Sequence, residues 1–254
     1  MLAIAVLVPE TALLVPGAAG RAVVLPEVRA AALDVIGDLL RSAPDRVVVV
    51  APGPVDRVVD APGRASLAAA GIDDDALDWS GGAGVPDGAL PAIGASVALL
   101  LLAHAGWTGP VTVVEVAASQ APDDGRGEAL RTRGADLVRG PDRVALVLAG
   151  SLSARHGAHA PQAEDARAAS FDADLLADLA LGDEPARGRL AQLTAGLAAE
   201  LAVTAWAPMQ VLLGAAGDIP VEAAVLEVSA PYGVPYVVAR WRTLPRHLPA
   251  GDRR

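Results

Sequence analysis

The stretch that decides the fold runs from residue 27 to residue 51 and reads EVRAAALDVIGDLLRSAPDRVVVVA. In its first part, Glu27 to Arg41, apolar side chains recur at helical spacing, and Pro26 directly before it fits the first turn of a helix. Its last part, Arg46 to Ala51, is a short run of valines, which is typical of a strand buried on both faces. A helix that leads into such a strand is the building unit of α/β proteins, in which helices cover both faces of the sheet.

The same alternation continues on both sides of this stretch. Further strands are expected at 2–8, 111–117, 143–149, 222–229 and 234–241, and further helices at 90–106, 127–133, 171–181, 185–203 and 207–216. Residues 62–88 and 150–170 read as loops, and the second is long enough to favour a functional role. We therefore expect a three-layer α/β/α fold with a mostly parallel or mixed central sheet. It forms a single domain over residues 1–243, followed by a flexible tail at 244–254.

Charge and composition exclude several classes of function. Thirty acidic residues against twenty basic ones give a formal net charge of −10, so nucleic acid and anionic membrane surfaces are unfavourable partners. Every basic residue is an arginine, which excludes Schiff-base chemistry and the lysine of phosphate-binding loops. No cysteine is present, which excludes disulfides and thiolate nucleophiles. The apolar start, Leu2 to Val8, lacks the basic flank of a signal peptide, so we expect a cytoplasmic protein.

A ligand site is expected in the segments that follow the predicted strands, because ligands of open α/β sheets bind beyond the carboxyl ends of the strands. Four such segments carry polar or distinctive side chains. They are Val8-Pro9-Glu10-Thr11, Ala51-Pro52-Gly53-Pro54, Gly150-Ser151-Leu152-Ser153-Ala154-Arg155-His156 and Val228-Ser229-Ala230-Pro231-Tyr232-Gly233-Val234-Pro235-Tyr236. Their side chains are the candidates for a functional site.

The four segments resemble, in order and spacing, the signature stretches of the class III extradiol ring-cleavage dioxygenases of the subunit-B (LigB-like) type and their Memo relatives. Active members typically carry Pro-His after the first and second strands, Gly-Asp-Leu-Ser-His in the middle loop and Glu-Gly-Pro-Phe-Gly-Val near the end. The match is strongest at Gly150 to Ser153, with Ala160-Pro161 and Phe171-Asp172 after it, and at Pro231 to Val234. The resemblance covers the chain to about Trp241 and implies the same α/β fold.

The departures from this pattern bear directly on function. The resemblance implies that two histidines and a glutamate hold iron(II) and that the middle-loop histidine moves a proton on a catechol substrate. Glu10, Gly53 and Ser229 stand at the three ligand positions, and Ala154 stands at the position of the proton-transferring histidine. Glycine and serine cannot replace an imidazole and a carboxylate, and alanine cannot transfer a proton. We therefore expect no iron cofactor, no metal site and no catalytic residues of the dioxygenase kind.

A rewired metal site is the second possibility. Glu10 keeps a carboxylate, His156 and His159 follow the lost middle histidine, and Glu227 shares a strand face with Ser229. Such a set could serve a metal-dependent oxidoreductase or hydrolase. The simpler interpretation is that both histidines are exposed on a polar loop and that Glu10 ends a strand.

Other side chains are weaker candidates. Arg155 could hold an anion through a bidentate contact, whereas Ser151 and Ser153 lack the sequence context of a hydrolase nucleophile. His104 is expected to pack in the core or in the last turn of its helix. Trp107, Trp206 and Trp241 are expected in the core or an interface, and residues 81–84 form a plain glycine-rich turn. The residues expected to line the crevice at the strand ends are Glu10, Ser151, Ser153, Arg155, His156, Glu227 and Tyr232.

Three functions remain open at this point. The first is a protein without iron that binds a small molecule or a protein partner in the crevice of the former active site. The second is the rewired metal-dependent enzyme, and the third is a structural subunit of a larger complex. A homo-oligomer is expected, because the Pro/Tyr/Trp segment from Tyr232 to Trp241 reads as apolar surface to be covered.

Overall fold

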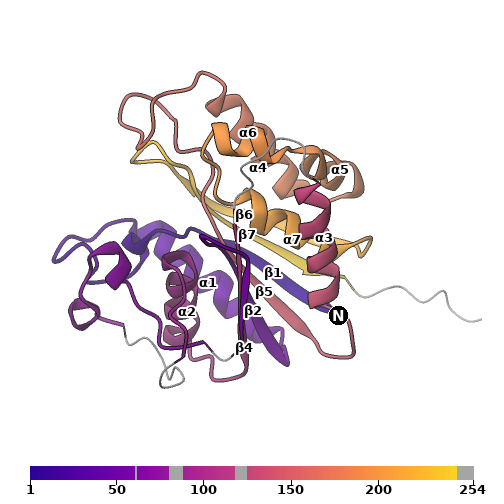
Figure 1. Cartoon of the computed structure of the whole chain (residues 1–254), viewed down its shortest axis with the longest axis horizontal. Helices are drawn as coiled ribbons and strands as arrows, with labels where there is room; N and C mark the ends of the chain where they lie inside the picture. The colour runs from indigo at the N-terminus through magenta and orange to yellow at the C-terminus, as the bar shows by residue number, and fades with distance from the viewer. Residues whose placement is uncertain (61, 80–87, 118–124, 245–254) are drawn as a thin grey trace, which may run out of the picture.

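A seven-stranded mixed sheet organises the protein in the computed structural model, which describes residues 1–60, 62–79, 88–117 and 125–244. The strand order is β3-β4-β2-β5-β1-β7-β6 (Figure 1). The strands are β1 (Leu2–Val8), β2 (Arg46–Pro52), β3 (Arg57–Asp60), β4 (Val111–Val116), β5 (Val144–Ala149), β6 (Val221–Ser229) and β7 (Tyr236–Thr243). β1, β2, β4 and β5 are parallel, whereas β3, next to β4, and β7, next to β1, run the other way.

The central strands are apolar on both faces because both faces are covered. In β1, Ile4, Val6 and Val8 belong to one hydrophobic core, and Leu2, Ala5 and Leu7 belong to a second core on the opposite face. Successive side chains of a strand point to opposite faces, so an uninterrupted apolar run is what a doubly covered strand requires. The prediction of a three-layer α/β/α protein is therefore confirmed.

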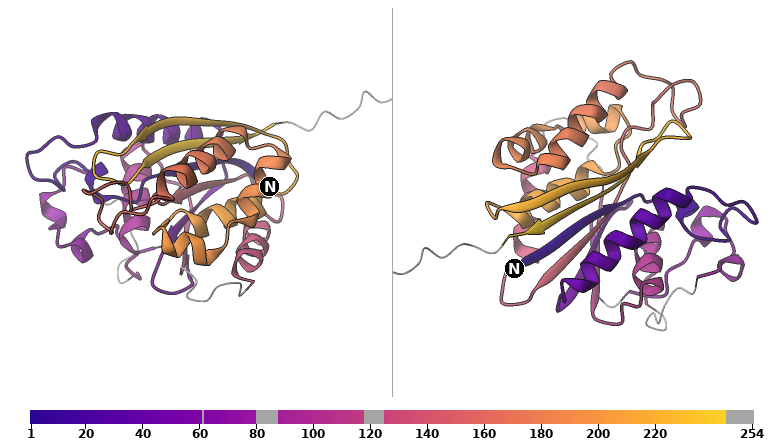
Figure 2. Two further views of the ribbon diagram at one scale, coloured as in Figure 1. Left: turned by 90° about the horizontal axis from the view of Figure 1, so that it is seen from above. Right: turned by 180° about the vertical axis from the view of Figure 1, so that it is seen from behind.

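The helices form two layers of unequal size. On one face lie α1 (Pro26–Arg41) and α2 (Ile93–His104), which pack with the first core (Figures 1 and 2). On the other face lie α3 (Arg126–Leu137), α4 (Ala168–Leu181), α5 (Glu184–Gln192), α6 (Ala195–Glu200) and α7 (Trp206–Ala216). The short 3-10 helices η1 (Ala12–Leu14), η2 (Ala68–Ala70) and η3 (Asp74–Ala76) lie in the connections on the side of α1 and α2.

Glycine allows two helices of the larger layer to touch backbone to backbone. A Cβ atom added to Gly134 of α3 would lie 1.9 Å from the carbonyl oxygen of Val211, and one added to Gly214 of α7 would lie 1.8 Å from that of Arg131. No larger residue fits at either position. A core built mostly from Ala, Val and Leu is thus closed by close helix packing, with few large aromatic anchors.

Most predicted elements match the structure, with three corrections. The helix predicted at 185–203 is two helices, because Thr194 begins a new one by accepting a hydrogen bond from the amide of Leu197 on its side chain. The edge strand β3 was missed, since its four residues carry too short a pattern. The helix predicted at 127–133 extends to Leu137.

Two edges of the sheet matter for function. The carboxyl edge is where β1, β2, β4, β5 and β6 end, and it contains all four segments named from the sequence. The amino edge, at the opposite end, is where these strands begin and where β7 ends. The predicted turn at 81–84 and the tail from residue 245 onward lie outside the described residues.

Candidate functional site

Glu10 lies just beyond the end of β1 and is half-buried, and its carboxylate contacts the segment that leads into α7. Its Oε1 accepts a hydrogen bond of 2.5 Å from the hydroxyl of Thr204, which precedes α7. Gly94 at the start of α2 is so near that an added Cβ would lie 3.1 Å from the Cβ of Glu10. Burial raises the pKa of Glu10 above its ordinary value, and the hydrogen bond from Thr204 opposes this shift. Glu10 is therefore a carboxyl group held in place in a site that favours its neutral form.

The second family position, Gly53, lies against the side chain of Glu115. A Cβ atom at residue 53 would lie 2.7 Å from the Cβ and 2.9 Å from Oε2 of Glu115. Glu115 is completely buried in β4, which is rare for a carboxylate. Arg57 of β3 neutralises it through two hydrogen bonds, Nε to Oε2 at 2.7 Å and Nη2 to Oε1 at 2.8 Å. The amide of Ala92, before α2, donates to the same carboxylate at 2.7 Å.

The middle loop begins with Gly150, where a Cβ atom would lie 2.5 Å from the Cα of Ala205. This close approach brings the loop to the start of α7. The amide of Ser151 donates to the hydroxyl oxygen of Thr204 at 2.9 Å, so Thr204 links the loop to Glu10. Ser151 and Ser153 are both buried. Ala154, the third family position, is held through its amide by the carbonyl of Leu201.

A histidine and a buried aspartate form a pair farther along this loop. His156 Nε2 lies 2.6 Å from Oδ2 of Asp172 in α4, and the amide of Ser153 donates to Oδ1 at 3.2 Å. An ionised carboxylate only accepts, so with Asp172 ionised the ring nitrogen that faces it carries a proton. Burial raises the pKa of Asp172, while the hydrogen bonds from His156 and Ser153 favour its ionised form. This pair is an imidazole ring held in one orientation by a buried carboxyl group.

The β6–β7 turn closes over the same loop (Figure 1). The amide of His156 donates to the carbonyl of Gly233 at 3.1 Å, and a Cβ atom at Gly233 would lie 2.6 Å from the Cα of Ala160. Gly233 also has a φ of 71°, a left-handed conformation that favours glycine. Tyr232 next to it is exposed. The Gly233 match to the family pattern thus has a physical reason, since a side chain there would displace the loop.

Ser229 and Glu227 lie on the edge strand. Ser229 pairs with Tyr236 and Glu227 with Val238, so both point toward the face covered by α1 and α2, as predicted from strand alternation. Burial raises the pKa of Tyr236, and the nearby charges of Tyr232 and Glu10 act in the same direction, whereas a hydrogen bond with the side chain of Thr11 opposes them. Tyr236 therefore belongs to the Glu10 end of the carboxyl edge.

The carboxyl edge contains all four family positions, but they are spread along it. Gly53 and Glu10 belong to strands separated by β5, a separation of about 10 Å at the usual strand spacing, and Gly53 and Ser229 are four strands apart, or about 19 Å. Within residues 1–60, 62–79, 88–117 and 125–244, no three His, Asp or Glu side chains gather closely enough to hold a metal ion. Convergence of all four positions on one crevice stays a prediction.

The structure also places Arg155 and three of the histidines. Arg155 donates a hydrogen bond from one guanidinium nitrogen to the carbonyl of Ala163, within its own loop. His159 is exposed, whereas His156 is half-buried, which corrects the interpretation that both are exposed. His104 ends α2 as predicted but is exposed and stacks on Trp79, with ring centroids 4.3 Å apart.

For two of the tryptophans the predicted burial is confirmed, whereas for the β7 segment the predicted exposure is not. Trp206 and Trp241 are buried and donate to the carbonyls of Leu193 and Leu179, which confirms a core role. The segment from Tyr232 to Trp241 was expected to be exposed; apart from Tyr232 this is wrong, because β7 is covered by α1 on one face and by the second core on the other. Homo-oligomer formation therefore loses that argument and stays a prediction.

Sequence reasoning missed the side chains that complete these contacts. Asp172 was part of the family match at Phe171-Asp172, and a single glutamate in the apolar strand around Glu115 signals a buried charge that needs a partner. Thr204 and Arg57 gave no such signal, because only the tertiary fold brings them to their partners.

Comparison with known proteins supports the fold alone. No protein-family model and no curated protein matches the sequence. The solved structure of an uncharacterized protein from Escherichia coli K12 is similar, with a TM-score of 0.53 and 15% identity over 94% of this chain and 99% of that one. At this level of identity the likeness extends to the arrangement of helices and strands. Among the described residues, no helix is both long and apolar enough to cross a membrane.

Proposed function

We propose that this chain is a relative of the class III extradiol dioxygenases that has given up iron and binds a small polar molecule at the carboxyl edge. The fold and the four ordered segments support the relationship. The observation that carries the loss of iron is the filling of the second ligand position by Glu115 and Arg57.

Iron does not fit the residues at this edge. An imidazole at residue 53 would meet the side chain of Glu115, since even a Cβ atom lies 2.7 Å from it. The carboxylate that fills the space is already neutralised by a guanidinium, so it has no charge left to offer a divalent cation. Ser229 supplies only a hydroxyl. Glu10 alone remains as a charged donor, and one carboxylate does not form the two-histidine, one-carboxylate set that iron(II) of this kind requires.

The same edge offers polar groups to a ligand. Glu10 offers a carboxyl group that accepts a hydrogen bond from Thr204, and burial raises its pKa. His156 presents an imidazole ring whose orientation is fixed by its contact with Asp172. A small molecule with hydroxyl or amide groups matches this set, because such groups both donate and accept hydrogen bonds.

A ligand-observed NMR screen of small polyols, amides and aromatic diols against the purified protein tests the proposal. Compounds that bind the wild type and lose binding in both Glu10→Gln and His156→Ala support it. Arg139→Gln, at an exposed position just beyond the end of α3, serves as a matched control and should bind as the wild type does. Absence of any compound sensitive to Glu10 or His156 counts against a binding role and favours a structural subunit.

A further inference from the structure

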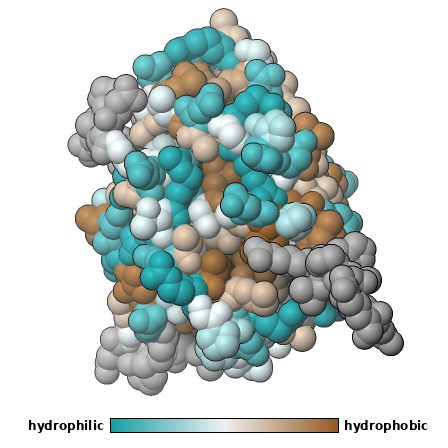
Figure 3. All heavy atoms as spheres, turned by 90° about the vertical axis from the view of Figure 1, so that its right-hand side faces the viewer, coloured by the Kyte–Doolittle hydropathy of each residue, from teal (hydrophilic) through white to brown (hydrophobic). Residues whose placement is uncertain are grey.

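A second site lies at the amino edge, far from the residues discussed above. A cavity of about 850 Å³ opens between the start of β1, the end of α1 and the end of β7. Figure 3 shows this side of the molecule, where hydrophilic side chains surround smaller apolar areas. The volume is within the range of small-molecule sites.

The charges that line this cavity are opposite to those of the protein. Three arginines, Arg41, Arg143 and Arg242, line it together with a single carboxylate, Asp38. The whole chain carries a formal charge of −10. A positive cavity in an acidic protein concentrates the field on small anions.

Asp38 does not cancel these arginines, because it is shared among several of them. Arg41 and Arg240 form ion pairs with it, and Arg242 approaches its Oδ2 at 3.8 Å. Partial burial works against its ionisation, but hydrogen bonds from Arg41 and Arg240 hold the pKa of Asp38 below its ordinary value. It therefore remains a compensated anion that holds the arginines in place.

Arg143 and Arg242 differ in how many hydrogen bonds their guanidinium groups already make to the protein. Arg143 donates from Nη2 to the carbonyl of Ser42 at 2.8 Å and from Nε to that of Ala43 at 3.4 Å, which fixes its position at the end of α1. Arg242 is 42% exposed and, within the described residues, has only the long contact with Asp38. Its planar guanidinium is therefore the group that can take a carboxylate or a phosphate in a bidentate contact.

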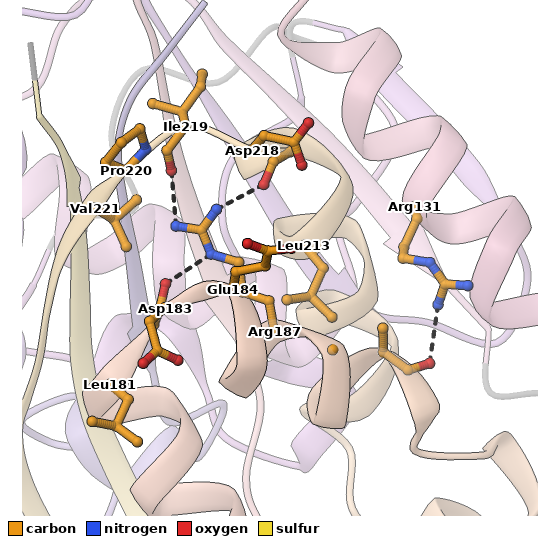
Figure 4. A pocket seen from close by; sticks show the side chains of 14 residues that line it. Arg131, Leu181, Asp183, Glu184, Arg187, Leu213, Asp218, Ile219, Pro220 and Val221 are labelled. Carbon is orange, nitrogen blue, oxygen red and sulfur yellow. Dashed lines mark hydrogen bonds between the residues drawn. The ribbon is translucent and has the colours of Figure 1, made fainter. Parts of the chain in front are cut away.

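A neighbouring cavity of about 770 Å³ shows the contrast (Figure 4). Its Arg187 donates to the carbonyls of Gly182, Gly217 and Ile219 and stacks over the ring of Trp241. Three acidic residues, Asp183, Glu184 and Asp218, line it as well. The guanidinium of Arg187 therefore joins α5 to the start of β6. The second arginine of this lining, Arg131, donates to Gln210 and to the carbonyl of Ala191, so protein acceptors hold both cations of this cavity.

We infer that the cavity at the end of β7 binds a small organic anion, with Arg242 holding its carboxylate or phosphate group and Leu2, Ile219 and Leu244 contacting an apolar body. The apolar lining is needed for this choice, because an inorganic ion would leave these side chains uncovered. The site is independent of the proposed function at the carboxyl edge.

Isothermal titration with benzoate and with phenyl phosphate tests the inference, and neutral benzamide of the same shape is the control ligand. The wild type should bind at least one of the two anions with a one-to-one stoichiometry, and benzamide at least about tenfold more weakly. Arg242→Gln should weaken anion binding at least about tenfold, whereas Arg139→Gln, just beyond the end of α3 with a side chain that is 79% exposed, should leave it unchanged. Circular dichroism confirms that both variants fold, and Arg41→Gln provides a second variant of the same lining.

Two sets of outcomes overturn the inference. One is the absence of saturable binding of both anions up to about 10 mM, or equal binding of benzamide. The other is anion binding that survives both Arg242→Gln and Arg41→Gln. Loss of anion binding in Glu10→Gln, with Arg242→Gln unaffected, would place the ligand at the carboxyl edge and contradict the inference while leaving the proposed function intact.

Discussion

Replacement of Arg57 by alanine should destabilise the protein strongly, because it leaves Glu115 buried without its cation. The side chain of Glu115 is 0% exposed, and Arg57 supplies both of the charged hydrogen bonds that it receives. Within the part of the chain that the structure describes, only the amide of Ala92 still donates to the carboxylate after this replacement.

Breaking a buried ion pair by removal of one partner typically costs about 3–5 kcal/mol. The side chain of Arg57 is 35% exposed, so water can reach the vacated position and reduce the loss. We therefore expect the free energy of unfolding to fall by about 2–3 kcal/mol at pH 8.

Urea unfolding followed by circular dichroism measures this change. Arg139→Ala is the control, because its pair with Asp136 is exposed on both sides and should contribute less than about 0.5 kcal/mol. In a double-mutant cycle, Glu115→Gln together with Arg57→Ala should lose less than the sum of the two single changes. A loss of less than about 1 kcal/mol in Arg57→Ala, or strict additivity, would refute the view that the pair fills the space beside Gly53 as a coupled unit.

Three further predictions concern the carboxyl edge. Gly53→Ala should lower the free energy of unfolding by about 1–3 kcal/mol, because the added methyl group overpacks against Glu115. Gly188→Ala in α5, where a Cβ meets nothing within 4 Å, should raise it by about 0.5–1 kcal/mol, and equal effects of the two changes in urea unfolding would contradict the prediction. Burial raises the pKa of Glu10 in the folded state, so the folded protein binds a proton more tightly than the unfolded chain does, and the stability of the wild type should fall as the pH rises from about 4.5 through the folded pKa. Glu10→Gln should abolish this slope, and melting curves of the two proteins with identical pH dependence would argue against the prediction. His156→Ala should lower the free energy of unfolding by about 1–3 kcal/mol, because it removes the hydrogen-bond partner of Oδ2 of buried Asp172. His159→Ala, on the exposed part of the same loop, should have no effect, and comparable losses for the two variants in urea unfolding would show that the contact between His156 and Asp172 does not contribute to stability.

The local pattern of the sequence was sufficient to predict the layers of the fold. Valine runs such as Arg46 to Ala51 and the periodic helix from Glu27 to Arg41 are set by neighbouring residues alone, so their bounds agree closely with β2 and α1. The break near Thr194 and the short strand β3 were missed, because a capping hydrogen bond and a four-residue edge strand alter the apolar pattern too little.

The candidate site was predictable only in part. The segments were found because they follow strands, and their shared edge follows from the parallel topology. Their partners were not predictable, since Glu10 meets Thr204 across 194 positions and Glu115 meets Arg57 across 58. Sequence spacing carries no information about such contacts, and they decide whether a carboxylate faces a cation, a hydroxyl or a histidine.

Iron retention after anaerobic loading tests the central claim most directly. The protein is incubated with iron(II), desalted and analysed for bound metal, and ring opening of protocatechuate is followed optically in the same sample. Because Gly53, Ala154 and Ser229 supply no imidazole or carboxylate, we predict that no stoichiometric iron remains and that ring opening does not exceed the no-enzyme control. One tightly bound iron per chain, with turnover that disappears in Glu10→Ala, would contradict the account.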